Sequence, residues 1–258
     1  GRPPGRIAFT GSQRSSDRGS TDGTENLLAA VHWAAHGPAP TGENGDASVI
    51  IMHANSNDGA CAIMPGCSTR KFHSSKRDAF QGINAHPLGM VLVGRSGDCQ
   101  IEMEVRTPTR DVTTKPTSFD EGKRILQLVA GAHMYADQIE FASNYDAILF
   151  HGTGLGHLPI EDSNGDSPEN VAMCKAVADY CTNGGVAVMV TQCIHGPIHM
   201  DVYNKGRKQQ ELGILGNHAT TGPDAALVKL HFLLSTNQDV QAGWGADLCG
   251  ENGSSIFN

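Results

Sequence analysis

The sequence has no apolar run of the roughly 18–20 residues that a membrane span requires, so it predicts no transmembrane helix. It has no C-x-x-C pair, because its seven cysteines stand singly, and this favours reduced thiols of a cytoplasmic protein over a disulfide framework. Repeats and low-complexity segments are absent as well. Basic residues are in no excess, since the net charge is −8, which argues against extensive direct contact with nucleic acid.

Glycine is abundant, at 31 of 258 residues, which suits an α/β protein with many tight turns between strands and helices. Short apolar runs predict strands, and apolar residues at helical spacing predict helices. The predicted strands are 7–10, 48–53, 60–64, 101–105, 125–131, 147–150 and 186–191, and the predicted helices are 27–35, 137–143, 168–180 and 224–234. The turn signal at 57–59 predicts that strand 60–64 runs antiparallel to the strand before it.

The segment 107–120 has two prolines and five threonines without apolar periodicity, and this composition predicts a linker. It divides the chain into two α/β units, 1–118 and 119–258. Because strands alternate with helices, we expect a parallel, doubly wound sheet in each unit. The first residue is Gly1 and a strand follows almost at once, so we expect the sequence to begin inside a longer protein.

Ligands of such sheets bind beyond the carboxyl ends of the strands, which here selects the loops after Thr10, Phe150 and Thr191. The loop 10–23 is dense in serine, glycine and aspartate and could cradle a small polar molecule such as an amino acid. The alternative is a solvated loop in which Asp22 or Thr24 caps the following helix.

The segment 70–78 carries four basic side chains besides a histidine, and most such runs are solvated surface. A functional interpretation requires one lysine to point inward, where it can accept a proton from a nearby hydroxyl. Lys71, which precedes Phe72, is the best candidate for that lysine. Arg70, Lys76 and Arg77 could instead contact a partner or a phosphate.

The glycine-rich segment 151–159 follows a predicted strand, and its glycines allow a close approach between backbone and ligand. It is not a dinucleotide fingerprint, because His157 stands where G-x-G-x-x-G needs its third glycine. We therefore interpret it as a ligand-contacting turn whose candidate pocket residues are Gly152, Thr153, Gly154 and His157.

Twelve histidines raise the question of a metal site, and His195 and His199 are the most suggestive pair. Gly196 and Pro197 lie between them, so no helix aligns the two rings as in an H-E-x-x-H site. The sequence therefore predicts no bound metal and no cofactor in this chain.

Four segments taken together resemble one known family: FTGSQRSSDRGSTDG (9–23), TRKFHSSKRDAFQGIN (69–84), FHGTGLGHLP (150–159) and VTQCIHGPIHMDVYNKGR (190–207). They are similar to the D subunits of archaeal glutamyl-tRNA(Gln) amidotransferases, which are relatives of L-asparaginases. The resemblance implies an asparaginase-like fold. It also implies a reaction in which a threonine hydroxyl attacks the side-chain amide of glutamine or asparagine and ammonia leaves.

Transferred to this chain, the resemblance assigns the catalytic lysine to Lys71 and substrate binding to Ser12 and Gln13. It places both catalytic threonines and an aspartate before the strand 7–10, and the chain has no G-G-T or G-T-D-T segment. The first unit is therefore expected to lack its N-terminal strands, and the chain alone is expected to be inactive.

The resemblance also implies partners. One is a second copy of the chain in a homodimer, and another is a tRNA-binding E subunit that uses ATP and Mg²⁺ to activate the glutamate on the tRNA. Two other functions remain open at this stage: a free-standing cytoplasmic L-asparaginase, and a non-enzymatic module that binds a small ligand.

Overall fold

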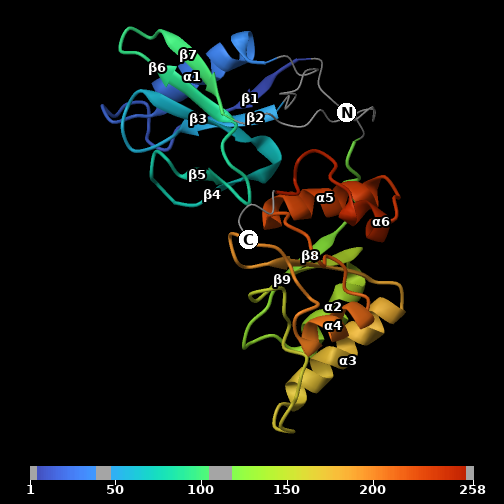
Figure 1. Cartoon of the computed structure of the whole chain (residues 1–258). Helices are drawn as coiled ribbons and strands as arrows, with labels where there is room; N and C mark the ends of the chain where they lie inside the picture. Colours follow the sequence, from blue (N-terminus) through green and yellow to red (C-terminus); the bar gives the residue numbers. More distant parts are fainter. Residues whose placement is uncertain (1–4, 39–47, 105–117, 254–258) are drawn as a thin grey trace. The chain divides into compact units, whose positions relative to one another are not determined.

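The computed structural model describes residues 5–38, 48–104 and 118–253. These residues form two compact units (Figure 1). The first contains the described residues up to Glu104 together with Leu248–Gly250, and the second contains 118–247 and 251–253. Most of the predicted linker, 107–120, lies outside the described residues.

The first unit is built on a five-stranded sheet with the order β1-β2-β3-β6-β7. Its strands are β1 (Ile7–Phe9), β2 (Ser48–His53), β3 (Ala60–Pro65), β6 (Gly89–Val93) and β7 (Cys99–Met103). Helix α1 (Gly23–His36) connects β1 to the rest of the sheet. A separate ribbon pairs β4 (Thr69–Lys71) with β5 (Phe80–Gly82), and a 3-10 turn, η1 (Gly66–Ser68), precedes it.

The sheet of the first unit is mixed, which corrects the expectation of a parallel sheet. Only β1 and β2 run parallel, whereas β2–β3, β3–β6 and β6–β7 are antiparallel. The antiparallel return of β3 was predicted from its turn, in which Gly59 has φ +101. The sequence patterns did not predict β6, and this strand joins β3 to β7.

Alternation along the strands places two different sets of side chains on the two faces of this sheet. Val49 and Ile51 of β2 and Ile63 of β3 pack against α1, through Ala29, Ala30 and Trp33 of the helix. The neighbouring positions, Met52, Ala62 and Met64, face the other way and contact Phe80 of the β4–β5 ribbon. By the same alternation His53 lies on the face that α1 covers.

The second unit has a three-stranded parallel sheet with the order β10-β9-β8, as its sequence predicts. The strands are β8 (Ile125–Val129), β9 (Ala147–Gly152) and β10 (Val186–Thr191). The helices are α2 (Ala136–Phe141), α3 (Pro168–Thr182), α4 (Asn204–Glu211), α5 (Pro223–Ser235) and α6 (Val240–Gly245), with a 3-10 turn, η2 (Ala142–Asn144), after α2. The sequence patterns did not predict α4 and α6.

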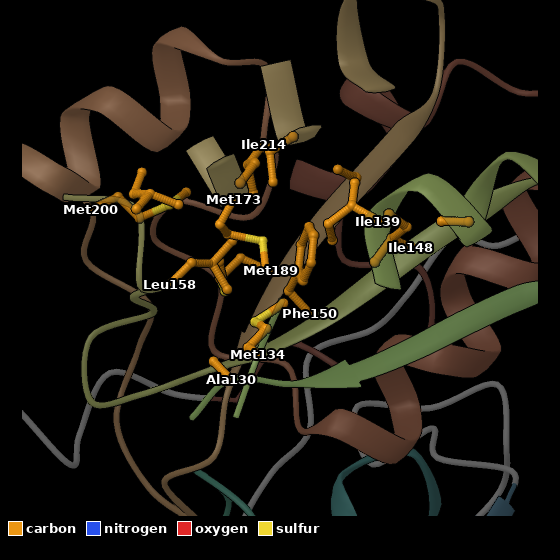
Figure 2. Close-up of a cluster of buried hydrophobic side chains, with 14 of the residues drawn as sticks. Ala130, Met134, Ile139, Ile148, Phe150, Leu158, Met173, Met189, Met200 and Ile214 are labelled. Atoms are coloured by element: carbon orange, nitrogen blue, oxygen red, sulfur yellow. The ribbon is translucent and has the colours of Figure 1, made fainter. Parts of the chain in front are cut away.

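Methionine and isoleucine side chains fill the core of the second unit (Figure 2). Ile148 and Phe150 of β9 and Met189 of β10 lie on one face of the sheet, where they meet Ile139 of α2 and Met173 of α3. Each of these five side chains is at most 1 % exposed. The packing fixes the strand ends from which the candidate loops leave. Within the described residues, no helix is both long enough and apolar enough to cross a membrane.

Candidate functional site

The loop between β1 and α1 is organised by one buried carboxylate. Asp22 is fully buried and accepts hydrogen bonds from the backbone N–H of Gln13 (3.0 Å) and of Arg14 (3.0 Å). The Ser12 hydroxyl lies 3.1 Å from the same carboxylate, and the Asn26 amide donates to it at 2.9 Å. Asp22 therefore holds the predicted substrate-binding residues Ser12 and Gln13 in a defined loop at the carboxyl end of β1.

The role of Asp22 differs from both sequence interpretations. It occupies the N-cap position of α1, but its side chain caps no helix amide and turns to the loop instead. Burial by itself would raise the pKa of the Asp22 carboxyl group. The hydrogen bonds from Gln13, Arg14 and Ser12 outweigh burial and hold that pKa below its ordinary value. Asp22 is therefore an anion that the loop is built around.

A chain of buried polar groups continues from Asp22 to the far end of the β2–β3 hairpin. The Asn26 side chain donates to the carbonyl of Gly11 (2.9 Å), and its oxygen lies 2.7 Å from Nδ1 of His53. On the other side of the ring, Arg77 lies 2.8 Å from Nε2 of His53, and it also contacts Asp58. Asn26, His53 and Arg77 are at most 9 % exposed.

These contacts lower the pKa of His53 and favour its neutral form. Burial and the nearby Arg77 guanidinium lower the pKa of His53, and the carboxylate of Glu25, 3.2 Å from Nε2, opposes them only in part. The neutral ring with its proton on Nδ1 donates to Asn26 and accepts from Arg77. That tautomer satisfies both nitrogens, so His53 serves to connect the loop to the hairpin.

Lys71 does not point inward, which corrects the sequence-based expectation. It is the last residue of β4, pairs with Phe80 of β5, and its side chain is exposed. The basic residue of this segment that turns inward is Arg77, whose guanidinium also donates to the carbonyl of Ser56 at 3.1 Å. The catalytic role of Lys71 stays a prediction.

The glycine-rich segment of the second unit forms a tight turn after β9. Thr153 and His157 exchange two backbone hydrogen bonds of 3.0 Å, which close the turn on itself. Gln209 of α4 fixes it from behind, because its side chain donates to Gly156 O and accepts from Leu158 N, each at 2.7 Å. The predicted pocket residues of this turn are therefore brought together.

The glycines of this turn are required for different structural reasons. Gly156 has φ +97, and a Cβ there would lie 2.8 Å from the side chain of Ile198. A Cβ on Gly152 would lie 2.6 Å from the sulfur of Met189. Only Gly154 borders open space, with nothing within 4 Å of a Cβ built on it. At Gly152 and Gly156 the close approach that we expected for a ligand is made by the protein itself.

The loop 10–23 and the turn 151–159 each carry one buried polar atom that has no hydrogen-bond partner among the described residues. In the first unit it is Oε1 of Gln13, and in the second it is Nε2 of His157. Burial and the charge of Lys205 lower the pKa of His157, which is 7 % exposed and packs edge-on against Tyr203. Buried polar atoms are rarely unsatisfied in proteins, so both atoms are candidates for contact with a ligand.

Sequence reasoning missed Asn26, His53 and Gln209. A signal for the first two is present, because Asn26 is a polar residue on the same helical stripe as Ala29, Ala30 and Trp33. His53 likewise ends an otherwise apolar strand on the face of Val49 and Ile51. Gln209 had no such signal, because α4 itself was not predicted.

Two α/β units with polar loops at the carboxyl ends of their strands agree with the asparaginase-like fold that the sequence resemblance implied. Residues 3–106 match the family Asparaginase, N-terminal, and residues 124–242 match the family Glutaminase/Asparaginase C-terminal domain. The chain belongs to this glutaminase/asparaginase family.

Among curated proteins, the chain is similar to two that are named as the D subunit of glutamyl-tRNA(Gln) amidotransferase. The one from Saccharolobus solfataricus is 34% identical over 92% of this chain and 49% of its own length. The one from Metallosphaera sedula is 35% identical over 93% of this chain and 50% of its own length. The chain thus spans about half the length of these relatives.

Solved structures of L-asparaginases share the fold. The thermostable L-asparaginase from Thermococcus kodakarensis matches with a TM-score of 0.76 and 21% identity, over 98% of this chain and 70% of that one. L-asparaginase I from Vibrio cholerae matches with a TM-score of 0.70 and 22% identity, over 96% and 68% respectively.

Proposed function

We propose that this chain is part of the amide-hydrolysing subunit of a tRNA amidotransferase. That subunit releases ammonia from the side chain of glutamine or asparagine. A partner subunit of the E type then uses the ammonia, with ATP and Mg²⁺, to convert Glu-tRNA(Gln) into Gln-tRNA(Gln). The observation that carries this proposal is the similarity to two D subunits over more than nine tenths of the chain.

The geometry of both candidate loops supports an amide as the ligand. The unsatisfied Oε1 of Gln13 is an acceptor, which an N–H group of an amino-acid amide would satisfy. In the second unit Nε2 of His157 is likewise unsatisfied, and with the ring proton on Nδ1 it would accept from the same kind of group. We assign Ser12 and Gln13 to substrate binding, and Gly152, Thr153, Gly154 and His157 to a ligand-contacting turn.

We further propose that the attacking hydroxyl is a threonine outside these 258 residues, since the G-G-T and G-T-D-T segments of the family do not occur among them. Lys71 is the family's lysine on this proposal and becomes enclosed when that segment is present. The chain by itself is then expected to release no ammonia, and it is expected to act as a homodimer in the complete enzyme.

A chimera tests this proposal. The part of the Saccharolobus solfataricus D subunit that precedes the matched region is fused ahead of Ile7, and ammonia release from glutamine and from asparagine is measured. We expect activity in the chimera and none in the chain alone. Lys71→Met should abolish it, whereas Lys76→Met, which alters an exposed lysine of the same segment, should not.

The partner separates the proposed function from its alternatives. Addition of a purified E subunit, ATP, Mg²⁺ and Glu-tRNA(Gln) should yield Gln-tRNA(Gln). Rapid asparagine hydrolysis without any amidation would favour a free-standing L-asparaginase, the activity named for both solved structures above. Activity of Lys71→Met close to that of its parent would contradict the role given to Lys71. Saturable binding of glutamine without turnover would favour a ligand-binding module.

A further inference from the structure

Two histidines and an aspartate of the second unit converge beside the glycine turn. They are His199, Asp201 and His218, and their ligand-type atoms all lie within 4.8 Å of one another. The carboxylate of Asp201 lies 2.9 Å from Nε2 of His218 and 3.9 Å from Nδ1 of His199. We propose that His199, Asp201 and His218 form a binding site for a divalent transition-metal ion, with Zn²⁺ as the best match.

The backbone fixes the three residues although His218 comes from a separate segment of the chain. His218 N donates to Ile198 O at 3.0 Å, and Ile198 N donates to Ala219 O at 2.9 Å, which pairs the two segments side by side. His199 N donates to Leu155 O of the glycine turn, also at 3.0 Å. The cluster is therefore part of the folded frame and does not depend on a chance meeting of long side chains.

The surroundings of the carboxylate are those of a metal ligand. Oδ1 of Asp201 accepts from Gln210 (3.0 Å) and from Asn217 (2.9 Å), which leaves Oδ2 facing the two imidazoles. Asn217 is itself held, because its oxygen accepts from Met200 N at 2.8 Å. Outer hydrogen bonds of this kind orient ligands and raise the affinity for the metal.

One ring nitrogen is available for a metal without breaking any hydrogen bond. Nδ1 of His199 is a buried atom that has no hydrogen-bond partner among the described residues. Nε2 of His218 lies 3.3 Å from Asn217 in addition to its contact with Asp201, so a metal would replace these contacts. Ligands at about 2.1 Å from Zn²⁺ stand about 3.4 Å apart in a tetrahedron, a spacing that rotation of the half-exposed rings can reach.

The chemistry of the donors selects the metal class. Two imidazoles and one carboxylate match three-ligand zinc sites, in which water completes the tetrahedron. Glu25, His53 and Asp58 of the first unit form a similar group, but the guanidinium of Arg77 lies against His53 and Asp58. The charge of Arg77 therefore already takes the place of a metal ion in the first unit. In the second unit, no lysine or arginine side chain within the described part of the chain contacts the carboxylate of Asp201.

The test is a calorimetric titration of the full chain with ZnCl₂ in a buffer that does not chelate metals. We expect one saturable site in the wild type and no saturation at that site in Asp201→Asn or His218→Asn. Asparagine is chosen at position 218 because His218 has φ +66, a conformation that asparagine tolerates. Asn217→Ala should weaken binding about tenfold, through the lost support of Asp201.

His195→Ala is the matched control, since it removes a histidine of the same loop that lies outside the cluster. A rise of the thermal midpoint with Zn²⁺ in the wild type, absent from His199→Ala, gives a second readout that is independent of calorimetry. The absence of wild-type binding, or equal affinity in all three ligand variants, would overturn the proposal. Both measurements detect binding alone, so their outcome does not depend on the amidase activity proposed above.

Discussion

Replacing Asn26 with alanine should destabilise the first unit severely, because that side chain joins the buried Asp22 and His53 to the partly buried carbonyl of Gly11. It donates to Gly11 O and to the Asp22 carboxylate, and it accepts from His53. A hydrogen bond between neutral groups contributes about 1 kcal/mol, and one to a charged group contributes about 1.5–3 kcal/mol. The sum is a loss of about 4 kcal/mol, or about a thousandfold in the folding equilibrium.

The two tryptophans of the chain allow this loss to be measured in one unit. Trp33 lies in α1 of the first unit and Trp244 in α6 of the second. In a Trp244→Phe background, tryptophan emission during urea unfolding reports on the first unit through Trp33, which is 2 % exposed. The free energy of unfolding then follows from linear extrapolation.

Val31→Ala provides the control on the same helix. Val31 is 60 % exposed, and its truncation should change the free energy of unfolding by about 0.5 kcal/mol or less. Asn26→Ala should also speed tryptic cleavage after Arg14 and Arg18, since the loop loses its anchor. A destabilisation by Asn26→Ala of less than about 1 kcal/mol would refute the reasoning, because it would mean that the polar network is solvated or that water replaces the lost amide.

Three further predictions concern other buried groups. Because the pKa of His53 is lowered in the folded state, the unfolded chain binds more protons than the folded chain below pH 6.5. The free energy of unfolding of the first unit should therefore fall as the pH is lowered from 6.5, and His53→Gln should weaken this pH dependence. Lys229 and Glu251 form an ion pair of 2.8 Å, and both side chains are 2 % exposed. Glu251→Leu alone should lower the free energy of unfolding by about 3–5 kcal/mol, because it leaves the charge of Lys229 buried without a carboxylate. Combining it with Lys229→Met should restore most of that stability in a thermal melt. The Sγ atoms of Cys67 and Cys249 lie 3.1 Å apart, so oxidised glutathione should join them in a disulfide as it is reduced to two thiols; peptide mapping that finds both cysteines unpaired would contradict this.

The elements that the sequence predicted well are those whose signal is local. The strands 48–53 and 186–191 have the predicted bounds, because each is an apolar run between turn residues. The helix 168–180 begins at the predicted proline and extends to Thr182. The direction of the strands in the first unit was not predictable in this way. It depends on the pairing of β6 with β3 and β7, which local patterns do not specify. The apolar run of β6 itself, between Pro87 and Gly94, was a local signal that the prediction overlooked.

In the candidate site, too, features with a local sequence signal were predicted, whereas orientations set by distant residues were not. The loop 10–23 was predicted to hold small polar residues at a strand end, and the structure places them there. Which basic residue of 70–78 turns inward was predicted wrongly. β4 spans only three residues, so periodicity cannot assign its faces, and the inward position of Arg77 is set by His53 and Asp58, which are distant in sequence.

The use of hydrogen bonds within the first loop restricts what it can recognise. The N–H groups of Gln13 and Arg14 are engaged by Asp22, and the Ser12 hydroxyl shares its one proton between the Asp22 carboxylate and the carbonyl of Arg14. A substrate carboxylate would have to displace the Asp22 anion to reach those two amides. The group left unsatisfied is an acceptor, Oε1 of Gln13. If the loop binds the amide substrate proposed above, its free acceptor therefore favours the N–H-bearing end of that substrate over its carboxylate.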